Sequence, residues 1–341
     1  MQILIVGEYL TNTDLEAGGA FRGKLNSMIF PWLRQVGIDP RECTFMNVFP
    51  QASPGRGLAG FFGPKSGAVP GMKMFKRGSY LRKEYAPALA ACRAAVVAAA
   101  PNVVIALGDL ALWALTSEAS LKFARGRITS GNSTLPHLKV LPTYSPAQIM
   151  ADWTLRPILL ADLEKARRES AFAEIRRPQR FIHLRPNLQD LKDFFTQYIE
   201  PCVDLDCDIE TKGTMITCVG FAPSPSRTLV IPFYDEEKPD GNYWPSAGDE
   251  YAAWQFVRRC LRAGKRLGGQ NFQYDMQYLW RQMGIKSRDF ADDTMLMHHA
   301  LQPEMQKGLG FLASVYTDEL AWKFMVRTAA NDKSAKKASS E

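Results

Sequence analysis

The sequence is poor in the residues that build local metal and disulfide motifs. Its 341 residues include only six cysteines and four histidines, and no two cysteines have the CxxC spacing of a zinc or redox site. Reduced, buried thiols are therefore expected, as at Cys207 and Cys218 on expected strands. No apolar run is long enough for a signal peptide or a membrane span. We expect a cytoplasmic protein of a bacterium or of a phage-infected host.

Acidic residues are outnumbered in the first half of the chain. The net charge is +7, and residues 1–175 hold 20 Lys and Arg against 13 Asp and Glu, whereas the remainder holds 22 of each. A local positive surplus indicates contact with DNA phosphates. The Gly- and Pro-rich stretch 51–83 is expected to be a long loop, either phosphate-contacting or merely solvated. Its basic residues include Lys65, Lys73, Lys76, Arg77, Arg82 and Lys83.

Short apolar runs alternate with helical patterns through the first half. The runs predict strands at 2–7, 44–49, 103–107 and 139–142, and the intervening patterns predict helices at 24–36, 84–99 and 109–117. This alternation is typical of a parallel sheet covered on both faces. Ligands of such sheets bind outside the carboxyl ends of the strands. Here those ends are residues 7–8, 47–50, 108–109 and 143–146.

These strand ends resemble those of the uracil-DNA glycosylases, especially the bacterial and archaeal types that usually carry an iron–sulfur cluster. The matching segments are 6–29, 47–50, 103–112, 125–126 and 141–150. The resemblance implies that Glu8 lies near the glycosidic bond, that Phe21 stacks on a flipped base and that Asn47 bonds its edge. Each also has an ordinary alternative: a solvated acid, a core residue and a turn former.

The chain departs from this family at two places. The family has His-Pro-Ser where this chain has Ser145-Pro146-Ala147. The resemblance implies that the His stabilises the negative charge on the leaving base, and a Ser hydroxyl is a weaker, uncharged donor. The cysteines do not match the family's cluster ligands, although Cys92 falls near one of them, so we expect no iron–sulfur cluster. The fold is then kept while the glycosylase chemistry is lost or altered.

An acidic strand is the main feature of the second half. From Val203 to Glu210 apolar and acidic residues alternate, which is the period of a half-buried strand. Asp208 and Glu210 therefore share a face, and Asp275 follows on an expected helix over 271–283. Several carboxylates in one small volume are what two-metal phosphodiester hydrolysis requires. A solvated acidic face without metal, and a surface acid at Asp275, are the alternatives.

This region resembles the 3′→5′ proofreading exonuclease domain of family A DNA polymerases, within the DEDD superfamily. The matching segments are DIET at 208–211, GQNFQYD at 269–275 and residues 292–316. The resemblance implies that Asp208, Glu210 and Asp275 ligate Mg²⁺ or Mn²⁺, that Asn271 supports the second motif and that Asp293 is a structural acid. The family's third motif, a Tyr followed by an Asp, is not matched, since Tyr316 and Asp318 come too early and are wrongly spaced.

The sequence thus predicts an α/β protein with two domains. A parallel-sheet, three-layer uracil-DNA-glycosylase-like domain at 1–165 and a linker at 166–180 precede a ribonuclease H-like exonuclease domain with a mixed sheet at 181–325. A disordered tail would occupy 326–341. The expected function is DNA processing as part of a phage-like DNA polymerase whose polymerase domain is absent from this chain. Partners would be single-stranded or primer–template DNA and replication proteins. A non-catalytic DNA-binding protein and an active uracil-DNA glycosylase are the alternatives.

Overall fold

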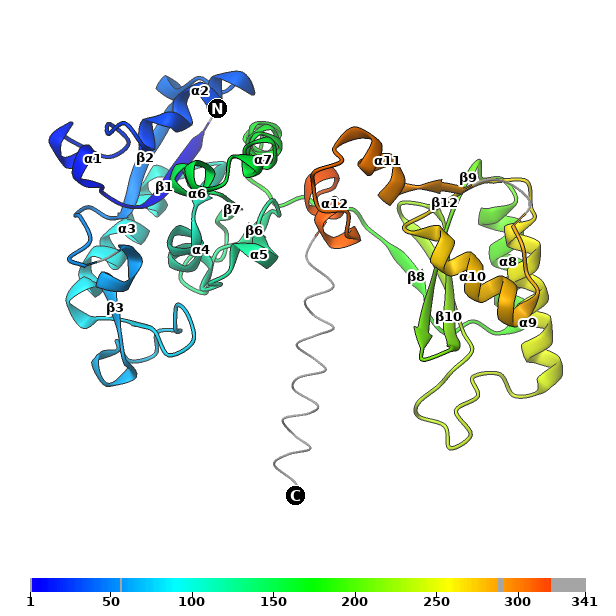
Figure 1. The fold of residues 1–341 in the computed structure, drawn as a ribbon. Coiled ribbons are helices and arrows are strands. Elements are labelled where there is room, and N and C mark those ends of the chain that lie inside the picture. Colours follow the sequence, from blue (N-terminus) through cyan, green and yellow to red (C-terminus); the bar gives the residue numbers. More distant parts are fainter. Residues whose placement is uncertain (1, 56, 288–290, 320–341) are drawn as a thin grey trace. The chain divides into compact units, whose positions relative to one another are not determined.

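The computed structural model describes residues 2–55, 57–287 and 291–319. The chain forms two compact units. One comprises Met1–Arg176 together with the segment that starts at Gly310, and the other comprises Arg177–Leu309. Both are α/β units built on a central sheet, as the sequence predicts (Figure 1). The tail predicted for 326–341 lies outside the described residues.

The sheet of the first unit has the strand order β2-β1-β5-β7-β6. Its first four strands are parallel, and only the short edge strand β6, which the sequence did not predict, is antiparallel. The strands are β1 (Ile3–Tyr9), β2 (Cys43–Phe49), β5 (Val103–Leu107), β6 (Thr129–Ser130) and β7 (Lys139–Thr143). The carboxyl ends of β1, β2, β5 and β7 therefore meet at one edge of the sheet.

Helices cover both faces of this sheet. On β1, Leu4 and Val6 pack into one apolar cluster with residues of α3 and α4, whereas Ile3 and Ile5 pack into another with residues of α2 and α7. Burial on both sides explains why the strands are continuous apolar runs. The helices are α1 (Asn12–Glu16), α2 (Ile29–Gln35), α3 (Ala86–Ala99), α4 (Asp109–Thr116), α5 (Leu121–Ala124), α6 (Pro146–Ala151) and α7 (Arg156–Glu169).

Residues 51–83 fold into a small substructure instead of a plain loop. Strands β3 (Phe62–Gly63) and β4 (Tyr80–Leu81) pair antiparallel, and further bridges join Ala68 to Arg82 and Lys76 to Ser79. Two 3₁₀ helices, Gly57–Phe61 and Lys65–Gly67, lie in the same stretch. A chain rich in Gly and Pro is ordered here because aromatic side chains anchor it to the sheet.

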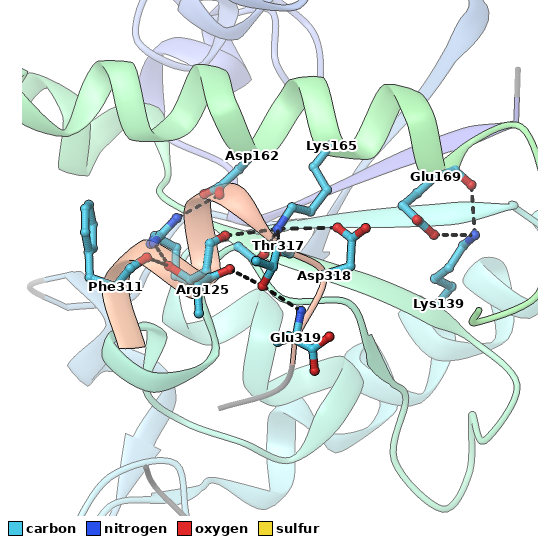
Figure 2. A network of polar contacts seen from close by, with 12 residues as sticks. Arg125, Lys139, Asp162, Lys165, Glu169, Phe311, Thr317, Asp318 and Glu319 are labelled. Carbon is cyan, nitrogen blue, oxygen red and sulfur yellow. Dashed lines mark hydrogen bonds and ion pairs between the residues drawn. The ribbon is translucent and has the colours of Figure 1, made fainter. Parts of the chain in front are cut away.

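The C-terminal segment that starts at Gly310 packs on the first unit. Helix α12 (Leu309–Tyr316) lies against a buried polar network (Figure 2). Lys165 donates to the carbonyl oxygens of Ser314 at 3.0 Å and of Thr317 at 2.6 Å. Arg125 donates to the Ser314 hydroxyl and forms a 2.7 Å ion pair with Asp162. The sequence instead predicts that this segment belongs to the second domain and that the linker begins at residue 166, which lies within α7.

The second unit has a mixed sheet of order β13-β12-β9-β10-β11-β8. The central strands β9, β10 and β11 form an antiparallel meander, whereas β8, β12 and β13 pair in parallel with their neighbours. The strands are β8 (Phe181–His183), β9 (Asp204–Lys212), β10 (Met215–Ser224), β11 (Arg227–Pro232), β12 (Arg266–Gly269) and β13 (Ala291–Asp293). The mixed sheet expected of a ribonuclease H-like domain is confirmed.

One face of this sheet forms the core of the second unit. Leu205, Cys207 and Ile209 on β9 pack with apolar residues of α8, α9 and α10. The helices are α8 (Leu188–Phe194), continued by a π-helical turn at Phe195–Ile199, then α9 (Ala247–Leu261), α10 (Phe272–Met283) and α11 (Thr294–Leu301). Among the described residues, no helix has the length and apolar character needed to cross a bilayer.

Candidate base-binding site

A small cavity opens at the carboxyl ends of the parallel strands in the first unit. It has a volume of about 80 Å³. All four residues selected from the sequence line it, although they lie on four separate segments. The lining residues are Gly7, Glu8, Tyr9, Thr11, Phe21, Leu25, Asn26, Asn47, Leu107, Ser145, Pro146 and Ala147. The fold therefore brings Glu8, Phe21, Asn47 and Ser145 together.

Glu8 lies at the end of β1, over the start of helix α4. Its Oε1 accepts a hydrogen bond from the Leu110 backbone N–H at 3.0 Å. Burial of the carboxylate raises the pKa of Glu8 to about 7, the Leu110 hydrogen bond lowers it, and the nearby Asp109 charge raises it. Gly108 leaves room for this side chain, since a Cβ there would lie 2.5 Å from the Glu8 carboxyl group. Glu8 can therefore exchange a proton near neutral pH.

Phe21 is held in a conformation that L-residues rarely adopt. Its φ angle is +61°, and its side chain is only 2% exposed. The ring lies 5.2 Å from that of Phe45 in a tilted arrangement. Such backbone strain persists only where the surroundings hold it. Here it turns the aromatic ring toward the floor of the cavity beside Gly7.

Asn47 presents a buried amide that the protein does not satisfy. It faces Gly7 across the β1–β2 pair. Neither its Oδ1 nor its Nδ2 has a hydrogen-bond partner among the described residues, and both atoms are shielded from solvent. Buried polar groups are nearly always paired, so this amide has bonding capacity left for a group that enters the cavity. The amide offers that ligand one acceptor and two donor hydrogens.

Ser145 combines a place in the cavity wall with a role as helix cap. Its Oγ accepts from the Gln148 backbone N–H at 3.4 Å, and its own N–H donates to Gln148 Oε1 at 2.8 Å. This capping box begins α6 directly after β7. Because Oγ accepts at the helix terminus, the hydroxyl proton remains for a ligand in the cavity.

A comparison with protein families assigns this unit. The profile of the uracil DNA glycosylase superfamily matches residues 1–175, just over half of the chain. The chain belongs to the uracil DNA glycosylase superfamily. The glycosylase-like first domain expected from the sequence is thereby confirmed. The relation of the second unit to polymerase exonucleases and a phage origin stay predictions.

Other comparisons add little to this assignment. No curated protein matches the chain. Among solved structures, the EXO domain of Aedes aegypti Nibbler is similar at 11% sequence identity and a TM-score of 0.31. That similarity covers 43% of this chain and 72% of the other. A likeness this distant supports no inference about the second unit.

The loop that shapes the cavity depends on an acid that the sequence reading missed. Asp14 is fully buried. Its carboxylate accepts from the Gly23 backbone at 2.8 Å and from the Asn26 amide at 2.5 Å, and it forms a capping box with Thr11. These bonds hold residues 11–26 closed. The Thr11-x-x-Asp14 spacing, a known helix-start pattern, was the available signal.

In the second unit, the acidic strand alternates as the sequence predicts. Asp206, Asp208 and Glu210 are exposed, whereas the residues between them are buried. Asp208 and Glu210 line one cavity of about 440 Å³, together with small residues of β10. The two carboxylates are therefore on the same face of the sheet, opposite the apolar core.

Asp275 lies beside this strand but is differently engaged. Its Oδ1 accepts from the Ile209 backbone N–H at 2.8 Å. Burial raises the pKa of Asp275 to about 7, that hydrogen bond lowers it, and the charge of Asp208 raises it further. Within the described residues, no three His, Cys, Asp or Glu side chains are arranged to hold a metal ion. The carboxylates as placed do not fit a metal centre, and a Mg²⁺ or Mn²⁺ ion stays a prediction of the sequence.

Two further acids have structural contacts. Asp293 accepts from the backbone N–H groups of Asn271 at 3.0 Å and Phe272 at 2.9 Å, and it also caps α11. Asn271 itself has a φ of +56° at the start of α10. Asp318, the acid weighed for the unmatched third motif, lies 3.6 Å from Lys165 in the first unit.

Proposed function

We propose that the first unit binds a single base extruded from a DNA strand. The observation that carries this proposal is the unpaired amide of Asn47, buried in one cavity with the Phe21 ring and the Glu8 carboxyl. An amide can accept from a ring N–H and donate to an adjacent carbonyl oxygen, which matches the edge of uracil. A flipped base is commonly read by such edge bonds together with aromatic contact.

Excision of the base by this site is expected to be slow or absent. Cleavage breaks the bond between the sugar C1′ and the base nitrogen, and its electron pair stays on the base while water adds to the sugar. The Ser145 hydroxyl lines the cavity at the position where the family has His, and it carries no charge. A missing well-placed donor typically costs on the order of a hundred- to a thousand-fold in rate. Binding of uracil-containing DNA is thus favoured over its repair.

At the level of the whole chain, we propose a DNA-processing protein that works with a DNA polymerase on single-stranded or primer–template DNA. Support comes from the superfamily match, the basic first half and the exonuclease-like motifs of the second half. A bacterial or phage-infected cytoplasm is the proposed location. Within the described residues, Asp208, Glu210 and Asp275 do not form a group that could hold a metal ion, and the proposal includes no hydrolytic step for the second unit. A non-catalytic DNA-binding role is therefore the second candidate.

The test is Asn47→Ala, measured by binding to matched single-stranded oligonucleotides that carry uracil or thymine at one position. We expect the preference for uracil to disappear. Thermal stability should stay the same or rise, because an unsatisfied buried polar group costs about 1–3 kcal/mol. Asn102→Ala is the matched control, since its amide donates to the Ser170 carbonyl at 2.8 Å away from the cavity. It should lower stability and keep the uracil preference.

Retention of the uracil preference in Asn47→Ala would show that the amide does not read the base. Absence of any preference in the unmodified chain would mean that the cavity is a remnant of the superfamily fold.

A further inference from the structure

The strongest unassigned feature is the charge of the segment that follows β2. Between Glu42 and Glu84 the sequence contains no Asp or Glu. Residues 62–83, here called the basic hairpin, carry six basic side chains in that stretch: Lys65, Lys73, Lys76, Arg77, Arg82 and Lys83. All six are exposed. An ordered surface with one sign of charge attracts a partner of the opposite sign.

Aromatic packing gives the basic hairpin a defined shape. Phe62 stacks on Phe75 with ring centroids 4.5 Å apart, and both rings meet Trp113 of α4 edge-on, at 5.6 and 5.9 Å. Arg82, the residue after β4, also donates from Nε to the carbonyl of Phe62 in β3 at 3.0 Å. Because Phe62 and Phe75 pack on Trp113 of α4, the basic side chains project from an ordered substructure rather than from a flexible loop.

Most of this charge is not neutralised within the chain. Lys76 pairs with Asp109 at 3.1 Å, and the charge of Lys73 acts on the Glu118 carboxyl without forming an ion pair. In the part of the chain that the structure describes, no ion pair is formed by Lys65, Lys73, Arg77 or Lys83. Four like charges on one small substructure repel each other, so an anionic partner that spans them would stabilise the arrangement.

The basic hairpin lies next to the base-binding cavity. Phe61 directly precedes the hairpin, and the centroid of its ring lies 5.5 Å from that of Tyr9. Tyr9 in turn lines the cavity. On the other side, Lys76 pairs with Asp109, whose neighbour Leu110 donates to Glu8. A strand whose base enters the cavity must therefore continue close to the hairpin.

We propose that the basic hairpin is a phosphate-binding platform for the DNA backbone that flanks the extruded base. The inference rests on the proposed function for its choice of DNA, and it names the surface that supplies the sequence-independent part of binding. Lys65, Lys73, Arg77 and Lys83 each contact phosphate, whereas Lys76 remains at the cavity edge with Asp109. Phosphate contacts of this kind position the strand without reading its sequence.

The experiment uses the full chain with all four residues changed to Gln: Lys65→Gln, Lys73→Gln, Arg77→Gln and Lys83→Gln. In the control variant, four exposed basic residues outside the hairpin are changed: Arg34→Gln, Arg167→Gln, Arg168→Gln and Lys192→Gln. Affinity for uracil-free duplex and single-stranded DNA is measured across a salt series. Each neutralised phosphate contributes about 0.9 to the log–log salt slope on duplex and about 0.7 on single strands. On duplex DNA, the magnitude of the log–log salt slope should fall by about 3 to 4 in the hairpin variant. In the control variant this slope should change little.

Equal slopes in the hairpin variant and the unmodified chain would overturn the platform, and so would equal losses in hairpin and control variants. Vesicles of phosphatidylserine and phosphatidylcholine provide a second probe. Loss of vesicle binding with unchanged DNA binding would assign the surface to a membrane and overturn the proposal.

Because the oligonucleotides contain no uracil, the result does not depend on the cavity. Asn47→Ala should keep the full salt slope. If uracil preference is absent but the slope falls only in the hairpin variant, the proposed base site fails and the platform stands. If the unmodified chain prefers uracil but the salt slope of the hairpin variant is unchanged, the base site stands and the platform fails.

Discussion

The shape of the candidate cavity depends on the absence of a side chain at two glycines. Gly7 faces Asn47 across the sheet, and a Cβ at Gly7 would clash with Asn47 Oδ1 and lie 2.8 Å from Phe21 Cζ. The absence of a side chain at this position lets an amide and an aromatic ring share the floor of one cavity. Gly108 also lacks a side chain, and this leaves space for the Glu8 carboxyl. Gly7 and Gly108 therefore determine which polar groups can line the cavity.

The raised pKa of Glu8 predicts a specific dependence of stability on pH. The pKa of Glu8 is about 7 in the folded chain, against an ordinary value of 4.5 for a glutamate in water. Below about 4.5 the carboxyl is protonated in both states and burial costs nothing. As pH rises toward about 7, the unfolded state releases its proton first, so the folded state loses relative stability, by about 3 kcal/mol at most.

Glu8→Gln should remove this loss, as measured by urea unfolding between about pH 4.5 and about pH 7. The exposed Glu16→Gln serves as the control and should keep the pH dependence of the unmodified chain. A pH profile that is identical in Glu8→Gln and the unmodified chain would show that Glu8 is solvated.

At the scale of elements, the start of helix α6 joins structure to chemistry. Ser145 caps this helix through Gln148 while it lines the cavity. One residue thus has two tasks, and a substitution acts on both. Loss of an N-cap hydroxyl costs about 0.5–2 kcal/mol, whereas gain of an imidazole at this position adds a stronger donor that can carry charge.

We therefore expect Ser145→His to lower stability and to raise uracil excision from a labelled oligonucleotide. Ser145→Ala is the matched control, because it removes the same cap without adding a donor. It should lose a similar amount of stability and gain no excision. If both variants excise equally, the position contributes nothing to the chemistry beyond capping.

At the scale of the whole molecule, the chain leaves the first unit after Arg176 and returns to it at Gly310. The returning helix α12 is held by Lys165 and Arg125, both buried. Asp162 joins this network to the cavity, because it accepts from Thr143 at 2.6 Å, two residues before Ser145. The first unit is thus completed only by residues that follow the second in sequence.

Lys165→Met should release α12. The carbonyls of Ser314 and Thr317 would lose a charged donor in a buried place, and breaking such a contact costs about 2–4 kcal/mol. Hydrogen exchange of residues 310–319 should accelerate, and the unfolding transition of the first unit should shift to lower temperature. Lys192→Met, on the exposed side of α8, should change neither. Unchanged exchange at 310–319 would contradict the anchoring role of Lys165.

Features that depend on neighbouring residues could be predicted from the amino-acid pattern alone. The run before Gly7 predicted a doubly buried strand, and the alternation at 203–210 predicted β9, because burial period is set within one element. Which of these elements pack against each other depends on long-range packing that no local pattern encodes. Packing of Phe62 and Phe75 on Trp113 turned a Gly- and Pro-rich stretch into an ordered hairpin.

Contacts between side chains and segments that lie far apart in the chain could not be predicted from the sequence either. Asp275 accepts from the Ile209 backbone N–H, between Asp208 and Glu210 on β9, and no local pattern indicates that contact. Helix α12 carries no local signal of its partner, since its place depends on cations that lie more than a hundred residues earlier. Contacts between distant segments depend on the closed fold, and for that reason a local pattern can nominate the residues of a site but cannot assemble them.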